Sequence, residues 1–139
     1  MVTYQTSLEG ISAEHLRGFF VGWPAPPKSE THLRVLQNSD YVVLAVDEGK
    51  VIGFINAITD KTLAAYIPLL EVLPEYQNKG IGTELAKEML VLLKDFYMVD
   101  LLCDAGLQPF YENLGMEKAV GMRIRNFDKQ SGNSSHIPQ

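Results

Sequence analysis

Two glycines separated by one residue, Gly80 and Gly82, stand directly before a segment with the apolar spacing of an amphipathic helix. A strand that leads through a short glycine loop into a helix gathers free backbone N–H groups and the positive end of the helix dipole at one point. Such a point attracts a phosphate group, and glycine lets that group approach the backbone closely. The same glycines could instead form a tight strand-to-helix turn, so this stretch alone leaves both interpretations open.

The spacing excludes two familiar phosphate loops. The dinucleotide pattern G-x-G-x-x-G needs a third glycine where Leu85 stands, and it normally follows the first strand of its unit. The P-loop pattern needs four residues between its glycines and a Lys-Ser/Thr pair, and this stretch has neither. Any phosphate bound here is therefore held by a different kind of loop.

The stretch resembles the acetyl-CoA signature of the GNAT superfamily of N-acetyltransferases, [RQ]-x-x-G-x-[GA], which reads here as QNKGIG at residues 77–82. Residues 71–76, EVLPEY, look like the family's approach to that loop, a strand ending in Pro-Glu-Tyr. Residues 110–116, FYENLGM, are similar to the F-Y-x-x-x-G-F that ends the family's last helix. The resemblance covers about residues 4–127.

The resemblance implies that acetyl-CoA is bound as the acetyl donor and that no metal is required. By resemblance, the backbone N–H groups of residues 78–82 and Thr83 hold the pyrophosphate, while Gln77 orders the loop. Lys79 is either a further phosphate contact or a solvated lysine. The backbone of the motif strand pairs with the pantetheine amides as an added strand would. The expected cofactor-binding residues are Leu70, Val72, Gln77, Asn78, Lys79, Gly80, Ile81, Gly82 and Thr83.

Acetyl transfer to an amine requires a proton donor for the departing thiolate and a base for the amine. Tyr111 matches the family position of the general acid, although a tyrosine on a short helix can also be a packing residue. Glu71, on the motif strand and on the opposite face from Leu70 and Val72, is the first candidate for the base, and a solvent-facing strand position is the alternative. Asp104 is the second candidate, and Glu75 is expected on the surface of the loop.

The chain departs from the family pattern at three positions. Asp104 and Leu107 stand where members often have Asn and Ala, and Met116 replaces the last Phe. These departures leave the pyrophosphate loop intact but change the expected contacts to the pantetheine arm. The first two departures support a second function, a non-catalytic acyl-CoA binding or sensing domain. A third alternative is an α/β interaction domain whose glycines are accidental and which binds no CoA.

The nature of the acceptor follows from charge and from one stiff loop. The formal net charge of −5 argues against a nucleic-acid partner and favours an amine-bearing small molecule, with a protein amine as the alternative. Residues 23–27, WPAPP, separate the first two expected helices and would form either a wall of the acceptor site or a simple packed connection.

The remaining reactive side chains give weaker signals. Cys103 lies in an apolar run and is read as a small buried hydrophobe rather than a nucleophile. The three histidines show no spacing typical of a metal site. No apolar stretch approaches the length of a membrane span, so we expect a cytoplasmic protein, with a homodimer through exposed strands as one option.

The elements that position these residues follow from local patterns. We expect a first strand at 4–8, a helix from a cap at Ser12 to about 21, and a helix from a cap at Ser29 to about 37. A hairpin is predicted from strands at 41–46 and 51–58. The apolar run at 63–73 is expected to be distorted at Pro68.

The second half is predicted to continue with the longest helix at 82–96, a buried strand at 99–103 and a short helix from Pro109 to Gly115. Residues 116–127 read as one or two final strands, and 129–139 as a disordered tail. These elements predict an α/β (α+β type) fold in one GNAT-like domain, residues 1–128. Its mixed, mostly antiparallel sheet is flanked by helices on both faces and splayed at the motif strand.

Overall fold

A long hairpin forms the centre of the sheet. The computed structural model describes residues 1–132, and in it β2 (Tyr41–Asp47) pairs antiparallel with β3 (Lys50–Thr59). Glu48 and Gly49 form the two-residue turn with φ of 50° and 79°. Two consecutive positive φ angles match the twist of the strands, which explains why this hairpin is tight. The predicted hairpin is confirmed.

The sheet has six strands in the order β1-β2-β3-β4-β6, and β5 also pairs with β3. The remaining strands are β1 (Val2–Gln5), β4 (Ala64–Tyr66), β5 (Leu70–Val72) and β6 (Met98–Asp100). Every pairing is antiparallel except that of β4 with β6, which is parallel. This mixed, mostly antiparallel sheet confirms the predicted fold class.

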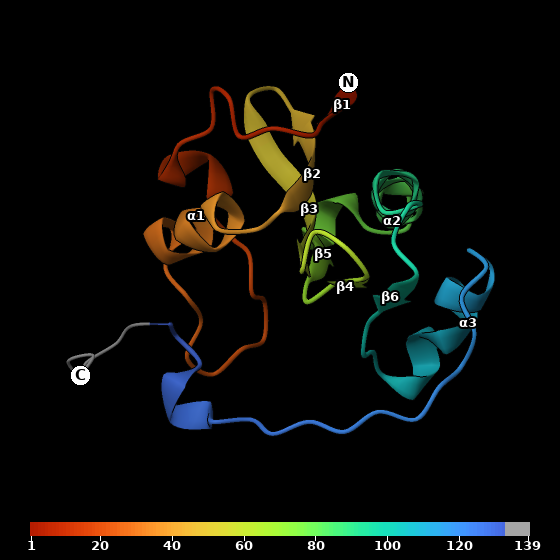
Figure 1. Ribbon diagram of the computed structural model, residues 1–139. Coiled ribbons are helices and arrows are strands. Elements are labelled where there is room, and N and C mark those ends of the chain that lie inside the picture. Colours follow the sequence, from red (N-terminus) through yellow and green to blue (C-terminus); the bar gives the residue numbers. More distant parts are fainter. Residues whose placement is uncertain (133–139) are drawn as a thin grey trace.

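Helices cover both faces of the sheet (Figure 1). On one face lies α2 (Ile81–Leu92), whose buried Leu85 and Met89 pack on β2 and β3. Gly53 of β3 permits this close packing, because a Cβ there would lie 3.0 Å from Leu85 Cδ1. The other face carries α1 (Ser29–Gln37) and a 3-10 turn, Ala13–Leu16. Buried side chains therefore pack against both faces of β3.

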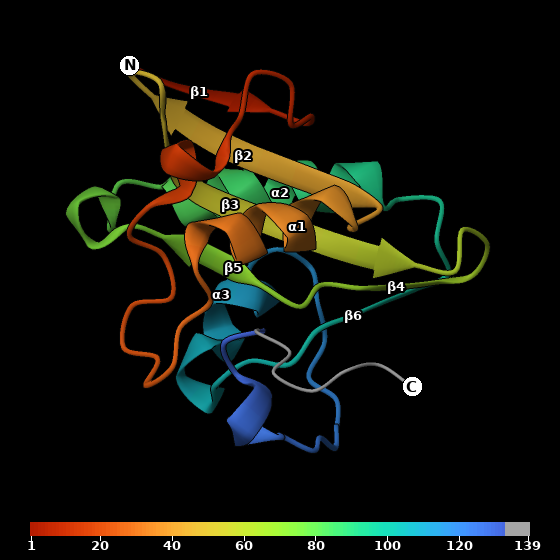
Figure 2. The ribbon, with the colours of Figure 1, turned by 90° about the vertical axis from the view of Figure 1, so that its left-hand side faces the viewer.

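The strands β4 and β5 come from one apolar run that is divided around Pro68, as predicted. β5 pairs with β3 at residues 53–55, whereas β4 pairs with residues 58–59 and continues to β6. Beyond β4, the strand β5 stays beside β3, whereas the chain that follows β6 runs away from it (Figure 2). The sheet therefore opens between β5 and the chain that follows β6.

The first predicted helix is much shorter than expected. The capping box at Ser12 is present, but only Ala13–Leu16 form a 3-10 turn. Gly18, Phe20 and Gly22 have φ of 95°, 64° and 84°, and such positive values stop a right-handed helix. The next helix has the predicted bounds, although its N-cap is Lys28 rather than Ser29.

The end of the chain differs most from the prediction. The strand β6 is shorter than 99–103 and partly exposed, and α3 (Gln108–Glu112) follows with Pro109 in its first turn. Residues 116–126 form no strand: the predicted final strands are wrong for this single chain. The backbone there runs away from the sheet and returns below α1 in Figure 1.

The last described residues are held against α1. Following a 3-10 turn, Phe127–Lys129, the Oε1 atom of Gln130 accepts a hydrogen bond of 2.9 Å from the Ala25 N–H. Arg34 Nη2 donates at 3.5 Å to the Gly132 carbonyl. The predicted disordered tail otherwise falls on residues 133–139, which lie outside the described residues.

Candidate active site

The glycine loop has the backbone geometry of an anion site. Asn78 and Gly80 have φ of 63° and 82°, and Gly80 is the N-cap of α2 without any side-chain cap. The first N–H groups of α2 are therefore free to bind a ligand. The Gln77 side chain donates at 2.9 Å to the Val72 carbonyl, so it ties the loop to β5.

The two glycines serve different purposes. Position 80 favours glycine because of its positive φ. A steric clash is not the reason, because nothing lies within 4 Å of a Cβ placed there. Gly82 has an ordinary φ, and its Cβ would meet Val72 Cγ2 at 3.8 Å, a normal contact. Glycine at position 82 thus leaves the backbone of the first helical turn uncovered by a side chain, and it does not relieve a steric clash.

The strand β5 offers a free backbone edge beside this loop. Its hydrogen bonds to β3 run from Leu73 N to the Ile52 carbonyl and from Asn56 N to the Leu69 carbonyl. Because alternate residues of a strand point their backbone groups to opposite edges, Leu70 and Val72 direct theirs away from β3. The Val72 carbonyl is occupied by Gln77, which leaves the Val72 N–H and both groups of Leu70 for a ligand.

A cavity of about 660 Å³ fills the opening between the two separated strands. One wall is 67–70, which ends at the first residue of β5, and the facing wall is 101–105, after β6. Tyr111 and Trp23 also line this cavity, so it joins the predicted acid, the motif strand and the proline-rich loop. The cavity extends to Arg123 and Arg125 near the chain end, whose part in the site the sequence did not reveal.

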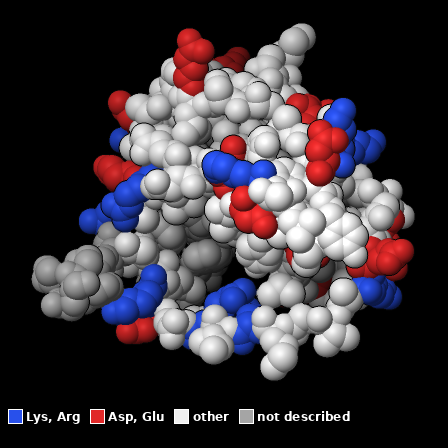
Figure 3. Space-filling model, in the orientation of Figure 1, with Lys and Arg blue, Asp and Glu red and all other residues white. Residues whose placement is uncertain are grey.

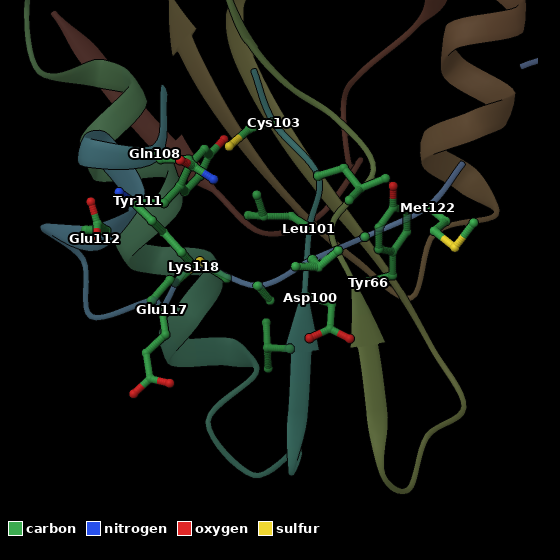
Figure 4. A pocket seen from close by; sticks show the side chains of 16 residues that line it. Tyr66, Asp100, Leu101, Cys103, Gln108, Tyr111, Glu112, Glu117, Lys118 and Met122 are labelled. Atoms are coloured by element: carbon green, nitrogen blue, oxygen red, sulfur yellow. The ribbon is translucent and has the colours of Figure 1, made fainter. Parts of the chain in front are cut away.

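A second cavity of about 540 Å³ adjoins the first, and Tyr111 lines both. Figure 4 shows Tyr111, Gln108 and Cys103 on one side of it and Tyr66 on the other. Burial raises the pKa of Tyr111 above 10.0, with a further contribution from the neighbouring Cys103. The phenol therefore stays protonated at neutral pH, which suits a proton donor.

Glu71 has a structural partner that the sequence did not indicate. Its Oε1 accepts from the Phe20 N–H at 2.8 Å and its Oε2 from the Val21 N–H at 3.2 Å. Phe20 has φ of 64°, a strained value for an aromatic residue, and its ring lies 4.8 Å from that of Trp23. Glu71 thus fixes the loop that brings Trp23 to the cavity.

The other candidate residues lie at the larger cavity or at the glycine loop. Asp104 and Cys103 line the larger cavity together with Tyr111. Lys79 lies over the Tyr76 ring, 5.5 Å from its centroid, at the outer side of the glycine loop. Glu75 is exposed in the turn before that loop, as expected.

Comparison with known proteins identifies the family of this chain. The Acetyltransferase (GNAT) family model matches residues 8–116. The chain belongs to the GNAT acetyltransferase family. A histone acetyltransferase of Glycine max, TAP1, is 31% identical over an alignment of 111 residues, and the match covers 70% of this chain and 47% of that protein. This GNAT chain thus spans about half the length of that curated relative.

Solved structures share the fold of this GNAT chain. A candidate acetyltransferase from Deinococcus radiodurans R1 is 47% identical with a TM-score of 0.91, over 99% of this chain and 94% of that one. An aminoglycoside N-acetyltransferase solved in complex with CoA is 17% identical with a TM-score of 0.66, covering 91% and 94% of the two chains. At that identity the likeness concerns the fold.

Residues 1–132 of this GNAT chain contain neither a cluster of metal-binding side chains nor a membrane-spanning helix. No three His, Cys, Asp or Glu side chains lie together there as metal ligands would. Within the same residues, no helix combines the length and apolarity needed to cross a bilayer.

Proposed function

We propose that this GNAT domain transfers an acetyl group from acetyl-CoA to a primary amine by direct attack. The observation that carries the proposal is the larger cavity, which brings Leu70 of β5, Tyr111 and Trp23 together. The same strand leads through the glycine loop to the uncapped N-terminus of α2. A long anionic thioester fits this arrangement: its pyrophosphate would lie on the N–H groups of residues 78–83 and its pantetheine along Leu70 and Val72. Lys79 would be a further phosphate contact.

The reaction then needs two proton movements. The amine nitrogen attacks the thioester carbonyl carbon, the C–S bond breaks, and the sulfur takes a proton from the Tyr111 phenol. The nitrogen loses a proton to a base. Glu71 remains our first proposal for that base, although both of its oxygens already accept backbone hydrogen bonds. Asp104 is supported by its position in the same cavity as Tyr111.

The acceptor proposed is a small molecule with a primary amine. The net charge of −5 favours a cationic partner, and the cavity beside Trp23 has the volume of a small-molecule site. A lysine or N-terminal amine of a protein is the alternative, because the Glycine max relative is named as a histone acetyltransferase. The cytoplasmic location stays a prediction, and cell fractionation would test it.

One experiment tests the donor and another the transfer. Calorimetric titration should give 1:1 binding of acetyl-CoA and much weaker binding of ATP and NAD. A panel of amines should then release free CoA thiol in a thiol assay. Equal binding of all three nucleotides, or none, would reject the acetyl-CoA site.

A second candidate function is an acyl-CoA binding or sensing domain without turnover. Asp104 and Leu107, the departures from the family pattern, favour it because Asp104 lines the cavity where the pantetheine would lie. Tight acetyl-CoA binding with no thiol release from any amine would support this candidate.

A further inference from the structure

Two arginines near the end of the chain lie at the larger cavity without a partner. Arg123 and Arg125 line the cavity of about 660 Å³, and both side chains are exposed, so a ligand in the cavity can reach them. Within residues 1–132, neither guanidinium takes part in an ion pair or a side-chain hydrogen bond. A guanidinium presents five N–H donors in a fixed fork. The cavity therefore has unused capacity to bind an anion.

The segment that carries these arginines is held at both ends. Before it, the Met116 N–H donates at 3.2 Å to the Tyr111 carbonyl. After it, the Ala25 N–H donates at 2.9 Å to Gln130 Oε1. Ala25 belongs to the proline-rich loop that brings Trp23 to the same cavity. The arginines are thus joined to the loop predicted to border the acceptor.

The charge at this cavity is opposite in sign to the charge of the whole chain. Its charged lining residues are two cations and one carboxylate, Arg123, Arg125 and Asp104, whereas the chain has a formal net charge of −5. Figure 3 shows Lys and Arg side chains along the lower rim of the hollow that opens at its lower centre. At physiological ionic strength, exposed charges more than about 8–10 Å apart are largely screened. The local arginines, rather than the net charge, therefore decide what the cavity attracts.

The arginines are separate from the loop expected to hold the pyrophosphate of acetyl-CoA. Of the described residues that line the larger cavity, none belongs to the glycine loop, 77–83. The arginines instead share the cavity with Tyr111, the proposed acid, and with Trp23. The anion that they bind is therefore expected on the acceptor and not on the phosphates of the donor.

We infer that the acceptor is a primary amine that also carries a carboxylate or phosphate group, bound by Arg123 and Arg125. The inference rests on the proposed acetyl transfer and adds the chemical class of the acceptor. The amine would lie toward Tyr111 and Asp104, which line the same cavity. The guanidinium forks would bind two oxygens of the anionic group, the geometry in which arginine holds carboxylates and phosphates.

The rest of the cavity wall indicates what joins the amine to the anion. This wall is mainly apolar and includes Ile67, Leu69, Leu101, Leu102 and Met122. An apolar wall offers no hydrogen-bond partner to a hydroxyl group, so burying one there is unfavourable. An alkyl or aryl spacer is therefore favoured over a sugar. Amino acids with an apolar body and aminoalkyl phosphates both have this structure.

Matched substrates test the inference. The amines γ-aminobutyrate and γ-aminobutyramide have the same length and differ in the carboxylate. Hydrogen bonds to a charged group should make kcat/KM about 10- to 100-fold greater for γ-aminobutyrate than for its amide. Aminopropyl phosphate, compared with aminopropanol, gives the same test for a phosphate group. The larger of the two ratios distinguishes a carboxylate acceptor from a phosphate acceptor.

Variants of the cavity assign this selectivity to the arginines. The double variant that combines Arg123→Gln and Arg125→Gln should bring the ratio of the two kcat/KM values close to one. Lys118→Gln is the matched control, because it removes one cation of the same segment, and Lys118 lines only the smaller cavity. The control should keep the wild-type ratio. Far-UV circular dichroism verifies that each variant is folded.

Two binding measurements separate this inference from the proposed function. Calorimetry should give the same Kd for acetyl-CoA in the double variant as in the wild type. Saturation-transfer NMR on the CoA-loaded protein detects γ-aminobutyrate or aminopropyl phosphate without turnover, and the signal should disappear in the double variant. Arginine-dependent binding without acetylation of any amine would reject acetyl transfer but support the anion site.

Four results would overturn the inference. The wild type could acetylate neither anionic amine faster than its neutral counterpart, or it could bind neither anionic amine in the NMR experiment. Lys118→Gln could reduce the selectivity as much as the double variant does, which would indicate long-range attraction by any cation of the segment. The double variant could bind acetyl-CoA more weakly than the wild type, which would assign the arginines to the phosphates of the donor.

Discussion

At the scale of single residues, Tyr111 has the environment of a proton donor. Burial raises its pKa, and its side chain borders both cavities. Among the described residues, no group accepts a hydrogen bond from its hydroxyl. The hydroxyl is therefore free for the role that we propose, protonation of the departing thiolate.

Tyr111→Phe is expected to reduce kcat by about 10²-fold or more, the range of a lost general acid. The Kd for acetyl-CoA should change little, because the loop at 78–83 and the edge of β5 are untouched. Steady-state rates and calorimetry on the same preparation measure both quantities. Wild-type turnover in the variant would make Tyr111 a packing residue.

Two carboxylates compete for the role of base, and matched amide variants separate them. Removing the base should abolish the fall in rate at low pH that titration of this carboxylate causes. Our first expectation is that Glu71→Gln does so. If Glu71→Gln lowers the rate but leaves the pH profile unchanged, Glu71 only holds the backbone of Phe20 and Val21. If Asp104→Asn then abolishes the fall in rate at low pH, Asp104 is the base.

His32 illustrates a histidine used for packing. It is 1% exposed, lies 4.4 Å from the Phe54 ring, and neither ring nitrogen has a hydrogen-bond partner within residues 1–132. Burial lowers its pKa from 6.5 to about 4. Between these values the unfolded chain binds a proton that the folded chain does not, so the free energy of unfolding decreases as the pH falls.

We expect wild-type stability to decrease by about 3 kcal/mol between pH 6.5 and 4 through this histidine. Urea unfolding across that range measures the loss. His32→Leu should have a flatter dependence, since the variant has no group at this position that titrates there. Parallel curves for the two proteins would show that His32 does not cause the pH dependence.

At the scale of elements, the junction between β5 and α2 is the most specialised part of the chain. The strand offers a free edge, the loop places Asn78 and Gly80 at positive φ, and the helix begins without a side-chain cap. Each feature is local, and together they give the anion-binding point that we propose next to one strand edge.

The two glycines of this junction should respond differently to alanine. Gly80→Ala forces a side chain to φ of 82°, which costs about 1–2 kcal/mol, and it should weaken acetyl-CoA binding about tenfold. Gly82→Ala has room beside Val72, so its free energy of unfolding should stay within about 0.5 kcal/mol of wild type. Chemical denaturation and calorimetry compare the pair. Equal losses for both would contradict the roles assigned to them.

At the scale of the whole molecule, the site depends on two strands that separate. β4 joins β6, β5 pairs with β3 alone, and the space between the two paths is the larger cavity. Apolar walls such as Ile67, Leu69 and Leu101 line that space in the absence of a ligand. A ligand that fills it should stabilise the whole fold.

Acetyl-CoA at about 100 times its Kd should add about 2.7 kcal/mol and raise Tm by about 5–15 °C. NAD at the same concentration should leave Tm nearly unchanged. Differential scanning calorimetry compares the two. An equal rise with both nucleotides would indicate a general anion site rather than one for CoA.

Much of this protein is determined by its sequence alone. The hairpin turn at Glu48-Gly49, the break at Pro68, the helix after Gly80 and the short helix at Pro109 follow from local backbone chemistry, because glycine and proline restrict φ in the same way in any fold. The loop pattern at 77–82 also depends on neighbouring residues only, which is why the family resemblance identified it.

Contacts between distant residues were decided by the tertiary structure. Glu71 binds the backbone of Phe20, which is 51 residues earlier in the chain, and no local pattern encodes that pairing. The first helix stopped early for a related reason: Phe19 and Phe20 turn into an aromatic cluster with His32 and Phe54, and that packing overrides helical spacing. The segment 117–125 has the alternation of a strand, but a strand also needs a neighbour to supply hydrogen bonds. Only the tertiary structure reveals that, within residues 1–132, no strand pairs with this segment.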